Sequence, residues 1–258
     1  MFTARPPAGR PRGLRPWLRF APVALFLVVL GLRLAHQPTY DALVQEDGPV
    51  EWATAVVYLV CAVVAAGAAW AFRRDGLRLA AGLYLLVALA MLGVAGEEIS
   101  WGQRVLGFAG PDVLVENNKQ DEANVHNLVG RPYLHAVYIV VGLYGAGLGR
   151  ALVERVRPLR GWSWLLAPGP ALRWYFLTLA AFYVWFEVSE VLLRPLLGDG
   201  VRPLSLGVSR MQEAVELGLA VGVLLFVLEV RRQARVGRAD AAPSPSALIS
   251  ATSERAEG

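Results

Sequence analysis

Six apolar stretches, each long enough to cross a lipid bilayer, constrain this sequence more than any other feature. A membrane-spanning helix needs about 20 predominantly apolar residues. Such stretches occur at about 17–35, 50–72, 77–97, 132–150, 174–194 and 211–230. Apolar residues make up 55% of the chain and charged residues 18%, whereas soluble proteins have about 45–50% and about 25%. We therefore predict an all-α, polytopic membrane helical bundle and exclude an ordinary soluble enzyme, a disordered chain and a fibrous repeat.

The first of these stretches resembles a signal peptide in some respects. Its uninterrupted apolar core, residues 20–32, is as short as the hydrophobic region of a signal peptide, and arginines precede it. However, Arg33 stands where cleavage would require a small residue before Ala35. We therefore favour a retained helix, with a cleaved signal peptide as the alternative.

Basic residues are unevenly distributed among the segments that connect the predicted spans. The two terminal segments and the second and fourth connections hold 18 of the 25 basic residues but only six of the 21 acidic ones. Because cytoplasmic segments are enriched in Lys and Arg, this alternation predicts six spans with both termini in the cytoplasm. We expect a multi-pass protein of the bacterial plasma (inner) membrane with the lipid bilayer as its partner. The basic composition follows from this topology, so no nucleic-acid partner is expected.

The chain divides into one membrane domain and two tails. Residues 1–16 are rich in Arg, Pro and Gly, and residues 236–258 are rich in Ala, Ser and Pro, so both are predicted to be disordered. The membrane domain covers 17–235. Its outward polar loop, 98–131, is too long for a simple turn, and we predict a short interfacial helix at 101–108.

Two small details bear on helix packing. Cys61 is the only cysteine and lies in an apolar run, which excludes a disulfide framework and predicts a small core residue. Gly145 and Gly149 form a small-x-x-x-small pair, which is typical of close helix packing, with dimerisation as the alternative.

Seven glutamates gather at the outward ends of the predicted spans: Glu51, Glu97, Glu98, Glu187, Glu190, Glu213 and Glu216. The ends of neighbouring helices in an up-down bundle reach the same membrane face, so we expect these residues to converge. A carboxylate within the hydrocarbon costs at least about 2.5–3.5 kcal/mol, which favours inward-pointing side chains close to cations, protons or a metal ion. Glu187 closely follows an apolar run and is expected to be the most buried of the four glutamates on the last two spans.

The outward loop carries a distinctive pattern of polar residues. It begins with Gly96-Glu-Glu-Ile-Ser-Trp-Gly-Gln-Arg104, followed by an Asn/Gln/Glu-rich stretch and His126-Asn127-Leu128. Together with Glu46-Asp-Gly-Pro-Val-Glu-Trp52 and the glutamates of the last span, this pattern resembles a group of uncharacterised bacterial multi-span membrane proteins. The resemblance covers most of the membrane domain. It supports the architecture and marks the site, and it implies no particular activity.

Three residues form the predicted metal site: Glu97, Glu122 and His126. Glu122 and His126 are four residues apart, so on a helical turn they would hold one ion together. Carboxylate and imidazole ligands suit a divalent cation, for which we consider zinc, iron or manganese.

The remaining site residues have predicted roles in catalysis and substrate binding. Glu98 or Glu213 would act as the base on metal-bound water. Arg104 would clamp an anionic headgroup, and Asn127 would orient the histidine or the substrate. The structural alternative is that the glutamates pair with nearby arginines at the water interface.

Three functions are consistent with these features. The first is a metal-dependent enzyme that acts on a lipid or lipid-linked substrate at the outward face. The second is a proton- or cation-coupled transporter, or an accessory subunit, in which the same glutamates act as relay groups. The third is a structural or assembly protein whose outer face binds a partner.

Overall fold

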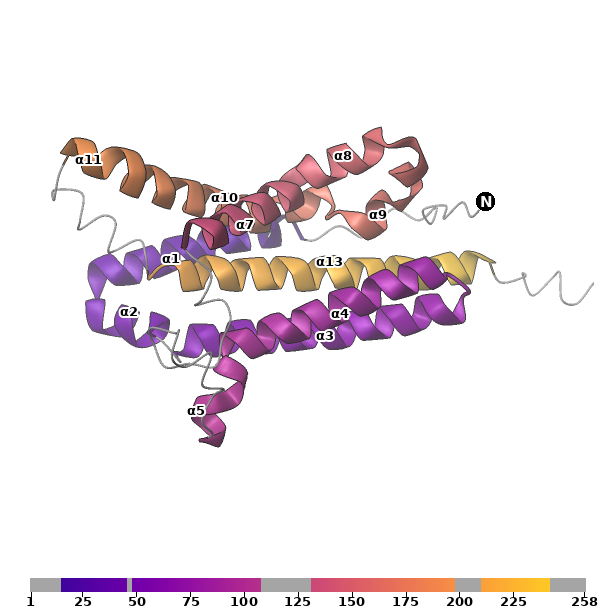
Figure 1. The fold of residues 1–258 in the computed structure, drawn as a ribbon, viewed down its shortest axis with the longest axis horizontal. Coiled ribbons are helices and arrows are strands. Elements are labelled where there is room, and N and C mark those ends of the chain that lie inside the picture. The colour runs from indigo at the N-terminus through magenta and orange to yellow at the C-terminus, as the bar shows by residue number, and fades with distance from the viewer. Residues whose placement is uncertain (1–14, 46–47, 108–130, 198–209, 242–258) are drawn as a thin grey trace, which may run out of the picture.

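The computed structural model describes residues 15–45, 48–107, 131–197 and 210–241. Within these ranges the chain is helical and contains no strand. The long helices lie roughly parallel to one another in a bundle (Figure 1). The all-α prediction is thereby confirmed.

The helices follow the apolar stretches of the sequence closely. The principal elements, in chain order, are α1 (Ala21–Ala35), α2 (Gln37–Val44), α3 (Pro49–Arg74), α4 (Arg78–Glu98), α7 (Arg131–Leu143), α8 (Gly149–Arg155), α10 (Arg173–Glu187) and α13 (Gln212–Ala241). A 3₁₀ turn, η1 (Pro16–Phe20), precedes α1, and α9 (Ser163–Leu166) and α11 (Arg194–Leu197) are single short turns. α13 extends to Ala241, six residues beyond the predicted end of the membrane domain at 235.

Four helical segments are long and apolar enough to cross a membrane: Pro16–Ala35, Gln37–Arg74, Arg78–Glu98 and Pro132–Arg155. They include the first four predicted spans, so the prediction of several apolar helices of spanning length is confirmed, and these helices are compatible with an integral membrane protein. The fifth and sixth predicted spans form α10 and α13, which do not meet the same criterion. Both helices nevertheless run alongside the others (Figure 1).

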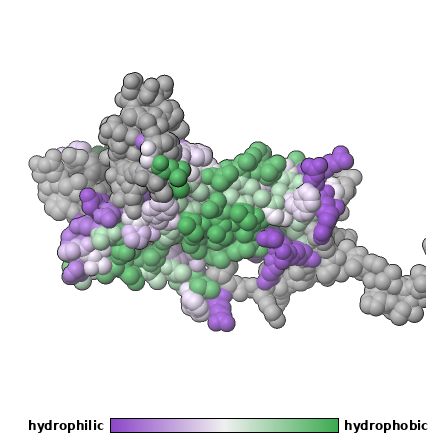
Figure 2. All heavy atoms as spheres, turned by 90° about the horizontal axis from the view of Figure 1, so that it is seen from below, coloured by the Kyte–Doolittle hydropathy of each residue, from purple (hydrophilic) through white to green (hydrophobic). Residues whose placement is uncertain are grey.

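The surface of the bundle is apolar around its middle. In Figure 2 a broad apolar band crosses the visible face, and hydrophilic residues gather at both ends. Large exposed side chains such as Val56 and Val63 on α3 and Leu86 and Leu89 on α4 contribute to the apolar surface. A continuous apolar surface of this kind is unfavourable in water and is suited to the acyl chains of a bilayer.

The core has two large buried clusters of similar size. One lies where α10 and α13 meet α1 and α2, and the other lies where α3, α4 and α13 meet. Cys61 is fully buried there, as predicted, and packs in one cluster with Tyr84 of α4 and Val227 of α13. The Tyr84 hydroxyl donates a hydrogen bond to the carbonyl of Leu165 at 3.0 Å. Helix α13 also contacts α10, which in turn packs against α7. α13 therefore connects the α3–α4 pair with the α7–α10 pair.

Two helices contain wider, π-helical turns. One lies at Tyr144–Leu148, directly after α7, where Gly147 has a φ of +145°. The other lies at Val188–Leu193, directly after α10. Such turns are rare and often occur near functional sites. Neither these turns nor the short helix α2 was predicted from the sequence.

Gly145 illustrates how closely α7 and α10 pack. A Cβ atom at this position would lie only 2.1 Å from the ring of Phe176 on α10. Gly145 therefore serves helix packing within one chain, whereas an added Cβ at Gly149 would meet the ring of Tyr144, five residues earlier.

Candidate functional site

Three glutamates converge at one end of the bundle. Glu98 is the last residue of α4, and Glu213 and Glu216 lie in the first turns of α13. One carboxylate oxygen from each lies within 4.8 Å of the other two. The spacing of three residues places Glu213 and Glu216 on the same side of α13, facing the end of α4. We call these three residues the carboxylate cluster.

A fourth glutamate lies near this cluster. Glu51 is in the first turn of α3, at the end of the bundle where α4 ends and α13 begins (Figure 1). It is close enough to interact electrostatically with Glu98. Three of the helix ends expected to converge therefore do so.

Glu216 is the most deeply placed member of the cluster. Its side chain is buried, and it accepts a hydrogen bond from the hydroxyl of Tyr183 on α10. Tyr138 of α7 lies close enough to Glu216 to interact with it electrostatically. The Tyr138 and Tyr183 rings are stacked, with centroids 4.7 Å apart and planes 10° apart. The Tyr183 hydroxyl, with the Tyr138 ring stacked against its own ring, thus holds this carboxylate in position, as hydrogen bonds around metal-binding carboxylates commonly do.

A buried histidine lies beside the two tyrosines. The Nδ1 atom of His135 on α7 is 2.5 Å from the Oε1 atom of Glu187 on α10. Its ring lies between Tyr183 and Phe186, with centroid distances of 4.9 and 5.0 Å. The Glu187 side chain is 32% exposed. The expectation that Glu187 is the most buried glutamate is therefore wrong, because Glu216 faces the core and Glu187 lies nearer the edge.

We expect His135→Phe to lower the free energy of unfolding by about 1–3 kcal/mol, because Glu187 would keep its partly buried carboxylate without a partner. Phenylalanine preserves the ring contacts with Tyr183 and Phe186. The double variant His135→Phe/Glu187→Leu should recover part of the loss. Unfolding in detergent, measured for both variants and for Glu187→Leu alone, checks this. If the stability lost in the double variant equalled the sum of the losses in the two single variants, the pairing of His135 with Glu187 would be contradicted.

Glu97, the neighbour of Glu98, has a different hydrogen-bond partner. It accepts a hydrogen bond of 2.9 Å from Nε1 of Trp101, in the turn that follows α4. Adjacent residues on a helix are separated by about 100° of rotation, so the side chains of Glu97 and Glu98 leave α4 in different directions and contact different neighbours.

The chain turns sharply just after these two glutamates, and α5 (Gln103–Leu106) runs across the direction of the bundle (Figure 1). Ser100 and Trp101 have positive φ angles of 46° and 56°, which are uncommon for residues other than glycine. The Trp101 ring lies over Gly96, where an added Cβ would come within 2.8 Å of it. The short helix predicted at 101–108 is present as two turns, η2 (Ser100–Gly102) and α5 (Gln103–Leu106). Part of the Gly96–Arg104 segment that stood out in the sequence therefore forms this turn.

The other predicted site residues are not placed by the structure. Glu122, His126 and Asn127 lie outside the described residues. Arg104 belongs to α5, but its side chain is not described. Of the predicted site, the structure brings together Glu98 and Glu213, the proposed bases, and adds Glu216 to them.

Three carboxylates at this separation require a compensating charge. Two unit charges 4.8 Å apart repel by about 3 kcal/mol at an effective dielectric constant of about 20. Either protons or a cation must reduce this repulsion. Carboxylate oxygens are the ligands that magnesium, calcium and manganese prefer. The cluster therefore has the chemistry of a cation or proton site.

The tyrosines and His135 could not have been assigned to this site from spacing. Tyr58, Tyr138 and Tyr183 belong to three different helices, and each lies in an apolar run. Tyr58 of α3 is buried near Glu98 and Glu216. The only indication in the sequence was that each of these tyrosines places a polar hydroxyl within an apolar run.

No family model matches the chain, and no curated protein or solved structure matches it. The function is accordingly argued from the geometry of the site.

Proposed function

We propose that this protein is a membrane-embedded enzyme that binds a divalent cation at the carboxylate cluster and acts on a lipid or lipid-linked substrate. The observation that carries the proposal is the meeting of Glu98, Glu213 and Glu216 within 4.8 Å. The hydrogen bond from the buried Tyr183 to Glu216 supports it, because it holds the carboxylate in a fixed orientation.

The ligand chemistry narrows the choice of cation. All three cluster residues offer oxygen atoms, which favours manganese over zinc or iron among the metals considered from the sequence. A bound divalent cation activates water or polarises a phosphoryl or carbonyl oxygen. A glutamate at the edge of the cluster, Glu98 or Glu213, would accept the proton released from that water. Glu216, held by Tyr183, would serve as a ligand.

A transporter is less well supported by the arrangement of the core. Beyond the cluster, the buried residues described along α3 are apolar and include Cys61, Ala65, Ala68 and Phe72. Val227 and Val230 continue this apolar core on α13. A transport path needs polar groups along its length, whereas an enzyme open to one face does not.

We also propose that α10, with its continuation to Leu197, and α13 are the fifth and sixth spans. Both run with the other helices, and the arginine-rich ends of α3 and α13 lie at the end of the bundle opposite the carboxylate cluster (Figure 1). Since basic ends face the cytoplasm, the cluster would face outward and both termini inward, in a bacterial plasma membrane.

The loop residues complete the proposed site. Glu97, Glu122 and His126 stay proposed as additional metal ligands, although the Trp101 hydrogen bond gives Glu97 a second, structural role. Arg104 and Asn127 stay proposed as contacts of an anionic substrate group.

Elemental analysis of the purified protein tests the cation site. We expect about one manganese, iron or zinc ion per chain in the wild type after incubation with these metals, and loss of that ion in Glu98→Gln/Glu213→Gln. The control Glu154→Gln/Glu229→Gln removes two carboxylates elsewhere and should retain the metal. Equal metal content in all three proteins would refute the site. Adding Glu122→Ala/His126→Ala tests the loop ligands separately.

Reconstitution into liposomes separates the enzyme from the transporter. Sustained proton or cation flux that depends on Glu216 would favour transport. We expect no such flux, and lipid-linked substrates should instead be converted by the metal-loaded protein.

A further inference from the structure

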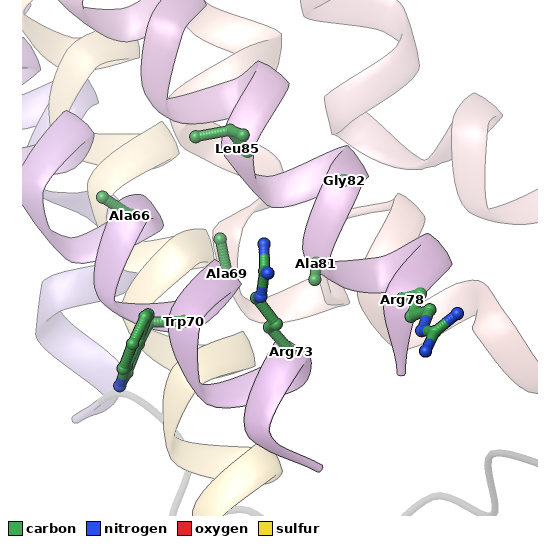
Figure 3. Close-up of a pocket in the computed structure, with 8 residues that line it drawn as sticks. All are labelled: Ala66, Ala69, Trp70, Arg73, Arg78, Ala81, Gly82 and Leu85. Carbon is green, nitrogen blue, oxygen red and sulfur yellow. The ribbon is translucent and has the colours of Figure 1, made fainter. Parts of the chain in front are cut away.

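A groove lies between α3 and α4 at the end of the bundle opposite the carboxylate cluster (Figure 3). Its volume is about 670 Å³. Small residues line much of it, namely Ala66 and Ala69 from α3 and Ala81 and Gly82 from α4. Because these residues have short side chains or none, the surface of the helix pair is hollowed where larger residues would fill it.

Gly82 faces open space. A Cβ atom added at this position would meet nothing within 4 Å. Leu85, one turn further along α4, and Trp70 on α3 are exposed and border the groove. The groove therefore opens onto the apolar outer surface of the bundle. On a surface that faces a bilayer, an acyl chain is the natural occupant of such a hollow.

Two arginines give the groove a positive end. In Figure 3 the side chain of Arg73 extends into the space between Ala69 and Ala81, while Arg78 lies at the rim. The two arginines flank the tight turn between α3 and α4. Guanidinium groups bind phosphate oxygens with two parallel hydrogen bonds, so this end is complementary to a phosphate.

We propose that the groove binds an anionic phospholipid, with one acyl chain along the small residues and the phosphate on Arg73 and Arg78. The apolar lining favours a lipid over a soluble phosphate. The arginine-rich end corresponds to the cytoplasmic leaflet in the proposed orientation, where basic pockets between spanning helices recognise anionic headgroups. This site is separate from the carboxylate cluster and independent of it.

Native mass spectrometry of the protein released from nanodiscs tests the headgroup contact. Wild-type protein should retain phosphatidylglycerol and release phosphatidylcholine. Arg73→Gln/Arg78→Gln should retain phosphatidylglycerol at least about tenfold less, since each arginine contributes to headgroup binding. The control Arg74→Gln/Arg232→Gln removes two exposed arginines from the same end and should behave as the wild type. An equal loss in both variants would overturn the proposal, because it would show only general charge attraction.

A second pair of variants tests the acyl-chain contact with every charge in place. Gly82→Leu fills the groove and should reduce phosphatidylglycerol retention by a similar factor. Gly93→Leu places the same side chain on α4 in open space away from the groove and should have no effect. Unchanged retention in Gly82→Leu would overturn the proposal. Displacement of the lipid by inorganic phosphate would also overturn it and would identify a site for a soluble anion.

Discussion

Replacing Glu216 with glutamine should abolish cation binding and, without the cation, make the protein more stable. Glutamine preserves the size of the side chain but removes one of three charges that lie within 4.8 Å of one another. The repulsion within the empty cluster therefore falls, and so does its attraction for a cation. Thermal unfolding in detergent, with and without manganese, should show opposite effects under the two conditions.

The expected magnitude follows from binding linkage. At a free cation concentration of about 100 times the dissociation constant, wild-type protein should gain about 2.7 kcal/mol of stability, whereas Glu216→Gln should gain almost none. Tyr183→Phe removes a hydrogen bond to Glu216 and should weaken cation binding by about 10–100-fold. Glu229→Gln, more than three turns further along α13, is the matched control and should respond as the wild type does. If Glu216→Gln gained as much stability as the control, the carboxylate would not be a ligand.

Gly142→Val should disrupt the contact between α7 and α10. An added Cβ at this position would lie 2.8 Å from the backbone oxygen of Phe176 and 2.9 Å from the backbone nitrogen of Ala180. These backbone atoms move only if the helices separate. Overpacking of this kind typically costs about 1–3 kcal/mol, and the bulk of valine places the expected loss at about 3 kcal/mol.

The same change should also weaken the cation site, since α7 and α10 supply Tyr138 and Tyr183. Unfolding and manganese titration of the same sample measure both effects. Gly31→Val is the control, because a Cβ there meets nothing within 4 Å. Similar stability of the two variants would show that α7 and α10 tolerate separation.

The helices were predictable because the requirement for a span is simple. About 20 apolar residues must follow one another, and α3 and α4 satisfy this almost to their terminal residues. The burial of Cys61 and the close packing at Gly145 follow from residue type alone. The short helix α2 was missed because its eight residues have no long apolar run.

The site was only partly predictable, since it depends on how the helices are rotated. The sequence places Glu97 and Glu98 side by side at a helix end, but only packing decides that Glu98 meets Glu213 while Glu97 meets Trp101. The positions of Glu187 and Glu216 were misjudged for the same reason. Distance from an apolar run indicates depth in a membrane, whereas burial also depends on which neighbouring helix covers the side chain.

The hydrogen bond between Tyr183 and Glu216 has a mechanical consequence. It joins α10 to α13, and a cation shared by Glu216 and Glu98 would also join α13 to α4, so that the bound cation would link the two helix pairs. Thermodynamic reciprocity then requires that any force parting α10 from α13 also loosens the cation. Lateral tension in the bilayer, or a substrate bound between α10 and α13, would therefore change the affinity of the carboxylate cluster for the cation.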